Sequence, residues 1–282
     1  MTTRILARIS RAKRPAKHLY GRWQVWRGFG YTGRRIEGGP LAGYLLYAGR
    51  RIPYVQQFWE GSYEVELLES LRNLVESDAV VYDIGANIGY HTLLFAAMAK
   101  RGRVYAFEPL PEVMQTLRRN LSANGIENVS TVQKVVASDT GSIAIGRSIY
   151  YDQAAVAWAG HGNVTIQCEA VSLDDFIADG NVPPTVLKID VEGAEREVLT
   201  GAIGVLARYK PLVVCESHGS ECAQQVYELL RRLGYELFRA ERGYERIGSA
   251  TEVPSRMEDG HVLACHPGGV QPPRRFREKA KA

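Results

Sequence analysis

Residues 79–100 read AVVYDIGANIGYHTLLFAAMAK, and this stretch decides the fold. A short apolar run ends at Gly85, and a segment rich in helix formers follows the glycine turn. A second apolar run, RVYAFEP, occupies 103–109, and EVMQTLRRNLSANG at 112–125 has the period of an amphipathic helix that stops at a glycine. Strands that alternate with helices predict a parallel sheet covered by helices on both faces.

The same alternation continues toward the C-terminus. Residues 139–171 alternate polar and apolar side chains, which predicts a hairpin or an irregular excursion. Further strands are predicted at 128–138, 185–190 and 211–217, further helices at 172–177, 194–209 and 222–234, and a final antiparallel strand pair at 235–240 and 261–267. We therefore expect an α/β fold with a mostly parallel sheet, whose ligands bind beyond the carboxyl ends of the strands.

The charge is unevenly distributed along the chain. The 282 residues suffice for one α/β domain with additions. Residues 1–60 carry twelve Lys or Arg against two acids, about +10, while the whole chain carries only +4. This predicts a basic N-terminal extension at 1–50, a folded domain at 51–267 and a basic flexible tail at 268–282.

The N-terminal residues lack the apolar core of a secretory signal. Arg4, Arg8 and Arg11 are spaced as on one helix face, so a peripheral contact of residues 1–20 with an anionic membrane stands beside the simpler interpretation, a solvated basic arm. The acid-free composition also leaves an organellar transit peptide open. The four cysteines have no metal-ligand spacing, and reduced thiols in a cytoplasm are the default expectation.

The loop DIGANIG at 83–89 is the first motif with chemical content. Its two glycines allow a tight turn, and the helix that follows offers free N–H groups to a ligand. It matches neither the dinucleotide pattern GxGxxG nor the P-loop GxxxxGK[ST]. The carboxylate at its entrance suits a cationic ligand. The cofactor-binding residues predicted here are Asp83, Gly85, Ala86, Asn87 and Gly89.

Glu108 ends the second strand, just before Pro109, and lies about 20 residues beyond the glycine loop. An acidic residue at this distance is suited to bind both hydroxyls of a ribose. A loop for a charged amino-acid group and a carboxylate for a ribose together fit S-adenosylmethionine. We therefore add Glu108 and Pro109 to the cofactor-binding residues.

Four segments together resemble the FkbM-type S-adenosylmethionine-dependent methyltransferases. They are VVYDIGANIGYHTLLFA, AFEPLPEVMQTLRRNL, KIDVEGAEREVLTGA and the upstream EGSYEVE, and the resemblance covers roughly residues 55–266. It implies a Rossmann-like class I methyltransferase fold with seven strands, the last antiparallel. It also implies methylation of a hydroxyl on a small molecule, a sugar or a lipid-linked glycan.

The box KIDVEGAERE at 188–197 carries the acceptor side of the predicted site. Asp190 shares a strand face with Lys188, its expected counter-charge, and Glu192 follows on the ligand-facing rim. Glu195 and Glu197 are expected mainly to offset the helix dipole. Glu216 and His218 follow the next strand on the same rim. Methyl transfer needs positioning and removal of a proton, so the catalytic candidates are Asp190, Glu192, Glu216 and His218.

The resemblance favours Tyr63 and Glu64 as pocket residues, although a helix N-terminus packed on the core fits the same segment equally well. With Lys188 they form the predicted substrate set. The oxygen-rich Asp190, Glu192 and Glu216 are compatible with Mg²⁺, but their spacing is not metal-specific, so no metal is predicted. Aromatic residues Tyr44, Tyr47, Tyr54, Phe58 and Trp59 are expected in a small core in preference to a sugar-stacking wall. His91, His161, His261 and His266 are expected at the surface or in packing roles.

Two other functions use the same fold. A nucleic-acid methyltransferase is suggested only by the basic ends, and the box after the fourth strand is DVEG where base-methylating enzymes carry [DN]PP[YF], so no nucleic-acid partner is expected. A non-catalytic, membrane-tethered module that binds the cofactor is the other alternative. Neither the acceptor nor the oligomeric state follows from the sequence.

Overall fold

The computed structural model describes residues 31–49, 54–147, 164–241, 243–255 and 260–270. The predictions for residues 1–20, for His161 and for the end of the basic tail fall outside these ranges. Within them, no helix combines the length and the apolar character that crossing a membrane requires.

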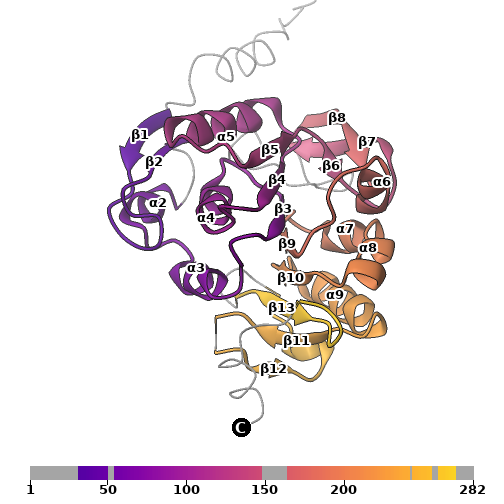
Figure 1. Ribbon diagram of the computed structural model, residues 1–282. Helices are drawn as coiled ribbons and strands as arrows, with labels where there is room; N and C mark the ends of the chain where they lie inside the picture. Colours follow the sequence, from indigo (N-terminus) through magenta and orange to yellow (C-terminus); the bar gives the residue numbers. More distant parts are fainter. Residues whose placement is uncertain (1–30, 50–53, 148–163, 242, 256–259, 271–282) are drawn as a thin grey trace, which may run out of the picture.

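The main sheet has eight strands in the order β12-β11-β13-β10-β9-β3-β4-β5 (Figure 1). Neighbours among β10, β9, β3, β4 and β5 are parallel, and β13 runs antiparallel to both β10 and β11. This confirms the predicted sheet with its antiparallel last strand, to which the two-residue β12 adds an edge. The strands are β3 (Val80–Ile84), β4 (Arg103–Phe107), β5 (Val129–Val132), β9 (Val186–Ile189), β10 (Leu212–Cys215), β11 (Glu236–Arg239), β12 (Arg246–Ile247) and β13 (Val262–Cys265).

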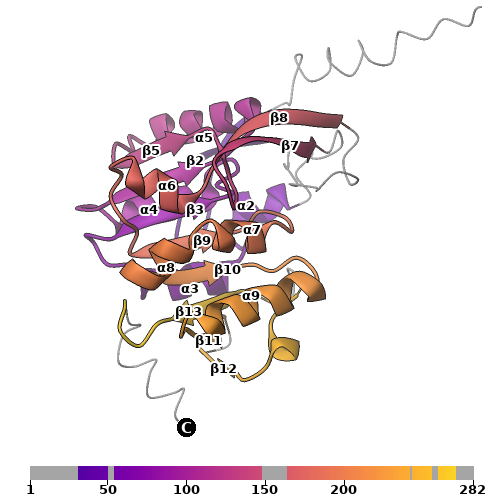
Figure 2. The same ribbon diagram turned by 90° about the vertical axis from the view of Figure 1, so that its right-hand side faces the viewer.

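Helices cover both faces of this sheet, which explains why its central strands are almost uniformly apolar. Val81 and Val186 point to one face, under α3 (Val65–Arg72), α4 (Tyr90–Met98) and α5 (Pro111–Ala123). Tyr82 and Leu187 point to the other. That face lies under α6 (Leu173–Ala178), α7 (Glu195–Thr200), α8 (Ile203–Tyr209) and α9 (Ser220–Arg232), with the short η1 (Ala250–Glu252) beyond (Figure 2).

The single helix predicted at 194–209 is wrong, because the chain breaks it into α7 and α8. A side chain at Gly201 would overlap the backbone oxygen of Ala137, so the chain passes very close to another segment there. The carboxylate of Asp174 accepts hydrogen bonds from the backbone N–H groups of Gly204 (2.9 Å) and Val205 (2.8 Å). A side chain remote in sequence thus caps the start of α8.

The strand predicted at 128–138 is also interrupted. Its second part, β6 (Val135–Val136), leaves the main sheet and pairs with β8 (Val164–Val171), which pairs with β7 (Gly141–Arg147). The antiparallel β7–β8 pair confirms a hairpin in the 139–171 region. The periodicity of residues 128–138 reports extended chain, but it does not show which sheet each half joins.

An N-terminal hairpin, β1 (Tyr31–Arg35) with β2 (Leu45–Gly49), packs on α5. The backbone of Leu45 pairs with the side chain of Asn124, and that of Tyr47 with Asn120. Leu46 is fully buried in the same core as the sheet. The described part of the predicted extension therefore shares the core of the domain, and α2 (Val55–Glu60) follows it.

Candidate active site

The glycine loop after β3 is shaped by its backbone. Gly85 and Asn87 have left-handed φ angles of 79° and 50°, and the N–H of Gly85 donates to the carbonyl of Phe107 (3.1 Å). A side chain at Gly85 would overlap the backbone oxygen of Asp190, so the loop lies directly against the end of β9. Only glycine permits this approach with this φ angle.

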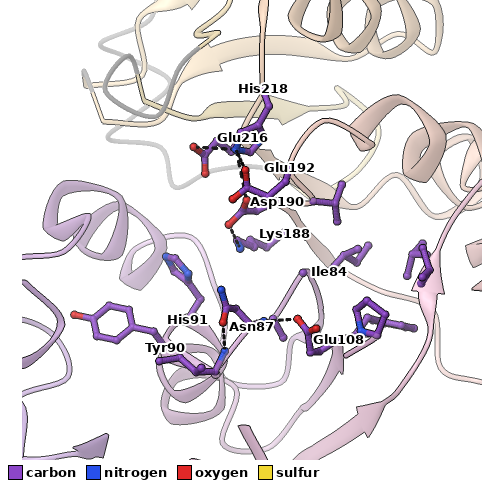
Figure 3. A pocket seen from close by; sticks show the side chains of 18 of the residues that line it. Ile84, Asn87, Tyr90, His91, Glu108, Lys188, Asp190, Glu192, Glu216 and His218 are labelled. Carbon is purple, nitrogen blue, oxygen red and sulfur yellow. Dashed lines mark hydrogen bonds and ion pairs between the residues drawn. The ribbon is translucent and has the colours of Figure 1, made fainter. Parts of the chain in front are cut away.

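Glu108 follows β4 and ties the loop to it. Its carboxylate is 4% exposed and accepts hydrogen bonds from the backbone N–H groups of Leu110 (2.9 Å) and Asn87 (3.2 Å). Burial raises its pKa to about 7, and the two N–H donors counteract that rise. The carboxylate borders a pocket of about 230 Å³, which Gly85, Ala86, Asn87 and Pro109 also line (Figure 3).

Two predicted cofactor residues lie outside the pocket lining. Asp83 is completely buried, accepts a hydrogen bond from the hydroxyl of Thr92 (2.6 Å) and lies 3.9 Å from the ammonium of Lys188. Gly89 caps α4 and contributes no pocket surface in the described chain. Asp83 and Lys188 are register partners on β3 and β9, so the strand pairing explains the contact. A direct contact of either residue with a cofactor stays a prediction.

Lys188 and Asp190 form a buried ion pair at the end of β9. The ammonium lies 2.9 Å from the Asp190 carboxylate and is 2% exposed (Figure 3). Burial lowers the pKa of Lys188, but Asp190 and Asp83 outweigh this effect and raise it above its ordinary value. Burial raises the pKa of Asp190, and Lys188 and His218 more than offset this, so the pKa of Asp190 is lowered. Asp190 is therefore an engaged carboxylate with little basicity.

His218 stands at the centre of the acceptor side. Its Nε2 lies 3.4 Å from Glu192, 3.5 Å from Glu216 and 4.0 Å from Asp190. Its Nδ1 lies 2.8 Å from the carboxylate of Glu195. All four catalytic candidates line one pocket, as the sequence predicts (Figure 3).

The interpretation of Glu195 as mainly helix-dipole charge is wrong. It lies in the first turn of α7, but it is completely buried and accepts hydrogen bonds from the backbone N–H of Gly193 (3.0 Å) and the thiol of Cys222 (2.8 Å). Together with its contact to His218, these bonds make it the residue that orients the imidazole. The helix-start position hid this role, because acidic residues are common there for other reasons.

The pKa values separate the catalytic candidates. Burial lowers the pKa of His218, but its contact with Glu195 prevails and the pKa rises to about 9. Burial raises the pKa of Glu192 to about 7, against the influence of His218 and with help from Asp190 and Glu216. At neutral pH His218 is thus protonated, while Glu192 titrates near neutrality.

Of the predicted substrate residues, Tyr63 and Lys188 line the pocket and Glu64 does not. Tyr63 lines the pocket within an aromatic group, with ring centroids 4.5 Å from Phe58 and 5.1 Å from Tyr54. Phe58 and Trp59 are buried in the core, as expected, and Tyr54 and Phe58 also line the pocket. Glu64 lies outside the pocket lining and faces two histidines.

Two of the histidines expected at the surface or in packing roles are buried and also face a carboxylate. His91 and His261 are buried, with Nε2 atoms 3.0 Å and 3.8 Å from Glu64. His261 immediately precedes β13, which runs antiparallel to β10, so its start lies beside the end of β10. The antiparallel last strand that the family resemblance implies was the available signal for His261. His266 lies elsewhere and packs its ring against Tyr235, at 5.4 Å between centroids.

Comparisons with known proteins agree with this geometry. The family model for the methyltransferase FkbM domain matches residues 83–237. Hexuronic acid methyltransferase AglP of Haloferax volcanii is 31% identical over 65% of this chain and 76% of its own length. The 31-O-demethyl-FK506 methyltransferase FkbM of Streptomyces tacrolimicus is 30% identical over 55% of this chain and 72% of its own length.

Among solved structures, the methyltransferase FkbM from Methylobacillus flagellatus aligns with a TM-score of 0.45 and 18% identity, covering 68% of this chain and 44% of that one. The family match spans more than half of this chain and includes both the glycine loop and the residues that follow β9 and β10. The chain therefore belongs to the FkbM family of S-adenosylmethionine-dependent methyltransferases.

Proposed function

We propose that this protein transfers the methyl group of S-adenosylmethionine to a hydroxyl of a small-molecule acceptor, with sugars and glycans as the first class to test. The observation that carries the proposal is the pocket itself. Gly85, Asn87 and Glu108 border one side, and the carboxylates of Asp190, Glu192 and Glu216 border the other (Figure 3). Carboxylates on both sides of the pocket suit a sulfonium cation and the hydroxyl that attacks its methyl group.

The residues of the first side fit the cofactor. The Glu108 carboxylate is held by two backbone N–H groups and still borders the pocket, as a ribose-binding group must. Gly85 lines the pocket with main-chain atoms, so a ligand can approach the backbone closely there. When bound, S-adenosylmethionine supplies an electrophilic methyl group on a positively charged sulfur.

We assign the general base to Glu192. Its carboxylate is 34% exposed and lines the pocket, whereas Asp190 is paired with Lys188. Its backbone has a left-handed φ of 54° next to Gly193, a costly conformation for a side chain that the fold keeps at this position. A base with a pKa of about 7 matches the task of removing a proton near neutral pH. His218 is then the neighbouring cation that holds the carboxylates together.

The relatives support an oxygen-bearing acceptor. One is named for the methylation of a hexuronic acid, and another for an O-demethylated FK506. The aromatic group of Tyr54, Phe58 and Tyr63 on the pocket wall offers apolar surface for the face of a sugar ring.

The first test is cofactor binding by calorimetry, with S-adenosylmethionine and its demethylated product as ligands. Wild type should bind both, and Glu108→Gln should weaken binding by about 10–100-fold, the loss expected for a charged hydrogen-bond acceptor. Glu127→Gln, on the exposed surface, is the matched control. Absence of binding of either ligand to the wild type would refute the proposal.

The second test is transfer of a radiolabelled methyl group to a panel of hexuronic acids, neutral sugars and aliphatic alcohols, with RNA and DNA as comparison substrates. The proposal expects label on a hydroxyl of a small molecule. Label on nucleic acid alone, or on a nitrogen or a carbon, would contradict it.

A further inference from the structure

A second cluster of charged side chains lies next to the pocket and shares one residue, Glu216, with its lining. Glu64 precedes α3, Glu216 follows β10 and His261 precedes β13, so three distant segments meet at one point. One ligand atom from each of the three lies within 4.8 Å of the other two. Glu216 also lines the pocket, whereas Glu64 and His261 do not (Figure 3).

The ring of His261 is held in a defined orientation. The carboxylate of Glu241 accepts hydrogen bonds from the backbone N–H of His261 (2.9 Å) and contacts its Nδ1 at 2.6 Å. A carboxylate at Nδ1 keeps the proton on that nitrogen and directs the lone pair of Nε2 outward. This is the arrangement that metal-binding histidines use.

The Nε2 of His261 faces carboxylates at distances that do not suit a hydrogen bond. It lies 3.6 Å from Glu216 and 3.8 Å from Glu64, beyond the range of a good N–H···O bond. His261 is 2% exposed, and within the described chain its Nε2 and both carboxylate oxygens of Glu64 are buried without a hydrogen bond. Metal bonds of about 2.1 Å would put tetrahedral ligand atoms about 3.4 Å apart, close to the separations seen here.

The charge of the cluster is also compatible with a bound cation, because two carboxylates meet there. In the described chain, the ion pairs of Glu64 and Glu216 are all with histidines. One divalent cation would neutralise both carboxylates and leave His261 as an uncharged ligand. The neighbouring group Asp190, Glu216 and His218 differs, because Lys188 already neutralises Asp190 at 2.9 Å.

We propose that Glu64, Glu216 and His261 bind a divalent transition-metal cation, with Zn²⁺ or Mn²⁺ as the best match to two carboxylates and one imidazole. The cation joins α3, β10 and β13 and thereby holds Glu216 in the acceptor wall. His91, whose Nε2 lies 3.0 Å from Glu64, braces that carboxylate from α4. No metal was expected from the sequence, because Glu64 and His261 are remote along the chain from Asp190, Glu192 and Glu216.

The test uses the full chain, stripped with a chelator and then titrated separately with Zn²⁺, Mn²⁺ and Co²⁺. We expect one bound equivalent by elemental analysis, a higher melting temperature and, for Co²⁺, visible absorption bands typical of nitrogen and oxygen ligands. His261→Gln and Glu64→Gln should abolish equimolar binding, whereas His218→Gln should retain it. Failure of the wild type to bind any of the three metals would overturn the proposal, as would loss of binding in His218→Gln alone.

Glu241→Gln keeps the test decisive if the ligand variants do not fold. It leaves all three ligands in place and should weaken metal binding by about 10–100-fold, as loss of a ligand-orienting carboxylate does. Unchanged affinity in this variant would count against the geometry. Calorimetry with S-adenosylmethionine on the same preparations separates the two proposals, since cofactor binding without metal binding would leave only the methyl-transfer proposal standing.

Discussion

The two sides of the pocket are built in different ways. The proposed cofactor side comes mainly from residues 84–109, with Lys134, Val135 and Val136 beside them, and its loop is shaped by backbone hydrogen bonds and left-handed residues such as Gly85 and Asn87. The acceptor side gathers side chains from positions as distant as Tyr54 and His218, and it depends on buried charges. Residues close together in the sequence can form a binding site for a cofactor that a whole family shares. A site for a particular acceptor needs residues that the fold brings together from distant segments.

The largest expected effect sharpens this contrast on the acceptor side. Glu192→Gln should lower kcat by about 10²–10⁴-fold, since it removes the proposed base for the proton of the acceptor. The affinity for S-adenosylmethionine, measured by calorimetry, should stay within about twofold. Glu197→Gln, on α7 and outside the pocket lining, is the control. Full activity of Glu192→Gln would remove Glu192 from the mechanism.

The next prediction concerns the point where the two sides touch. Gly85→Ala should destabilise the fold by about 2–5 kcal/mol, because the new methyl group overlaps the backbone of Asp190 and the φ of 79° disfavours alanine. Gly125→Ala also has a left-handed φ, of 64°, but open space around it, and should cost only about 1–2 kcal/mol. Urea denaturation measures both. Equal losses of stability in the two variants would contradict a tight contact between Gly85 and the backbone of Asp190.

A smaller effect is expected from the support of the cofactor loop. The side chain of Asn120 donates to the carbonyl of Ile88 (2.8 Å) and also pairs with the backbone of Tyr47, whereas Asn124 pairs with Leu45 and does not reach the loop. Asn120→Ala and Asn124→Ala should each destabilise the protein by about 1–3 kcal/mol. Only Asn120→Ala should weaken cofactor binding as well, by about tenfold. Equal cofactor affinities in the two variants would contradict this link.

The smallest predicted effect is the pH dependence of the wild type. A base must be ionised to act, and the pKa of Glu192 is raised to about 7. We therefore expect kcat to increase as the pH rises through 7 and to be low at more acidic pH. Between pH 6 and pH 8 the ionised fraction grows about tenfold, and kcat should follow. A profile that is flat across this range, under conditions where chemistry limits the rate, would argue against a base with this pKa.

The sequence predicted the strands, their order of appearance and the residues that follow them, because parallel strands bring their carboxyl ends to one edge. This is why Glu108, Asp190, Glu192 and His218 meet in one pocket, as expected. The local periodicity of the sequence did not predict the elements correctly where contacts with distant residues determine them. Asp174 starts α8 from another element, and residues 135–136 leave the main sheet to pair with β8.

The sequence by itself determined the fold family and the glycine loop and carboxylate that border one side of the pocket, since these follow from short-range patterns of apolar residues, glycines and one carboxylate. Only the tertiary structure decided what each buried charge does. Asp83 lies near the ammonium of Lys188, Glu195 contacts the imidazole of His218, and Glu64 lies near the imidazole of His261. The physical reason is that ionisable groups in a protein interior take their protonation and their roles from neighbours within a few ångströms, and those neighbours come from distant parts of the chain.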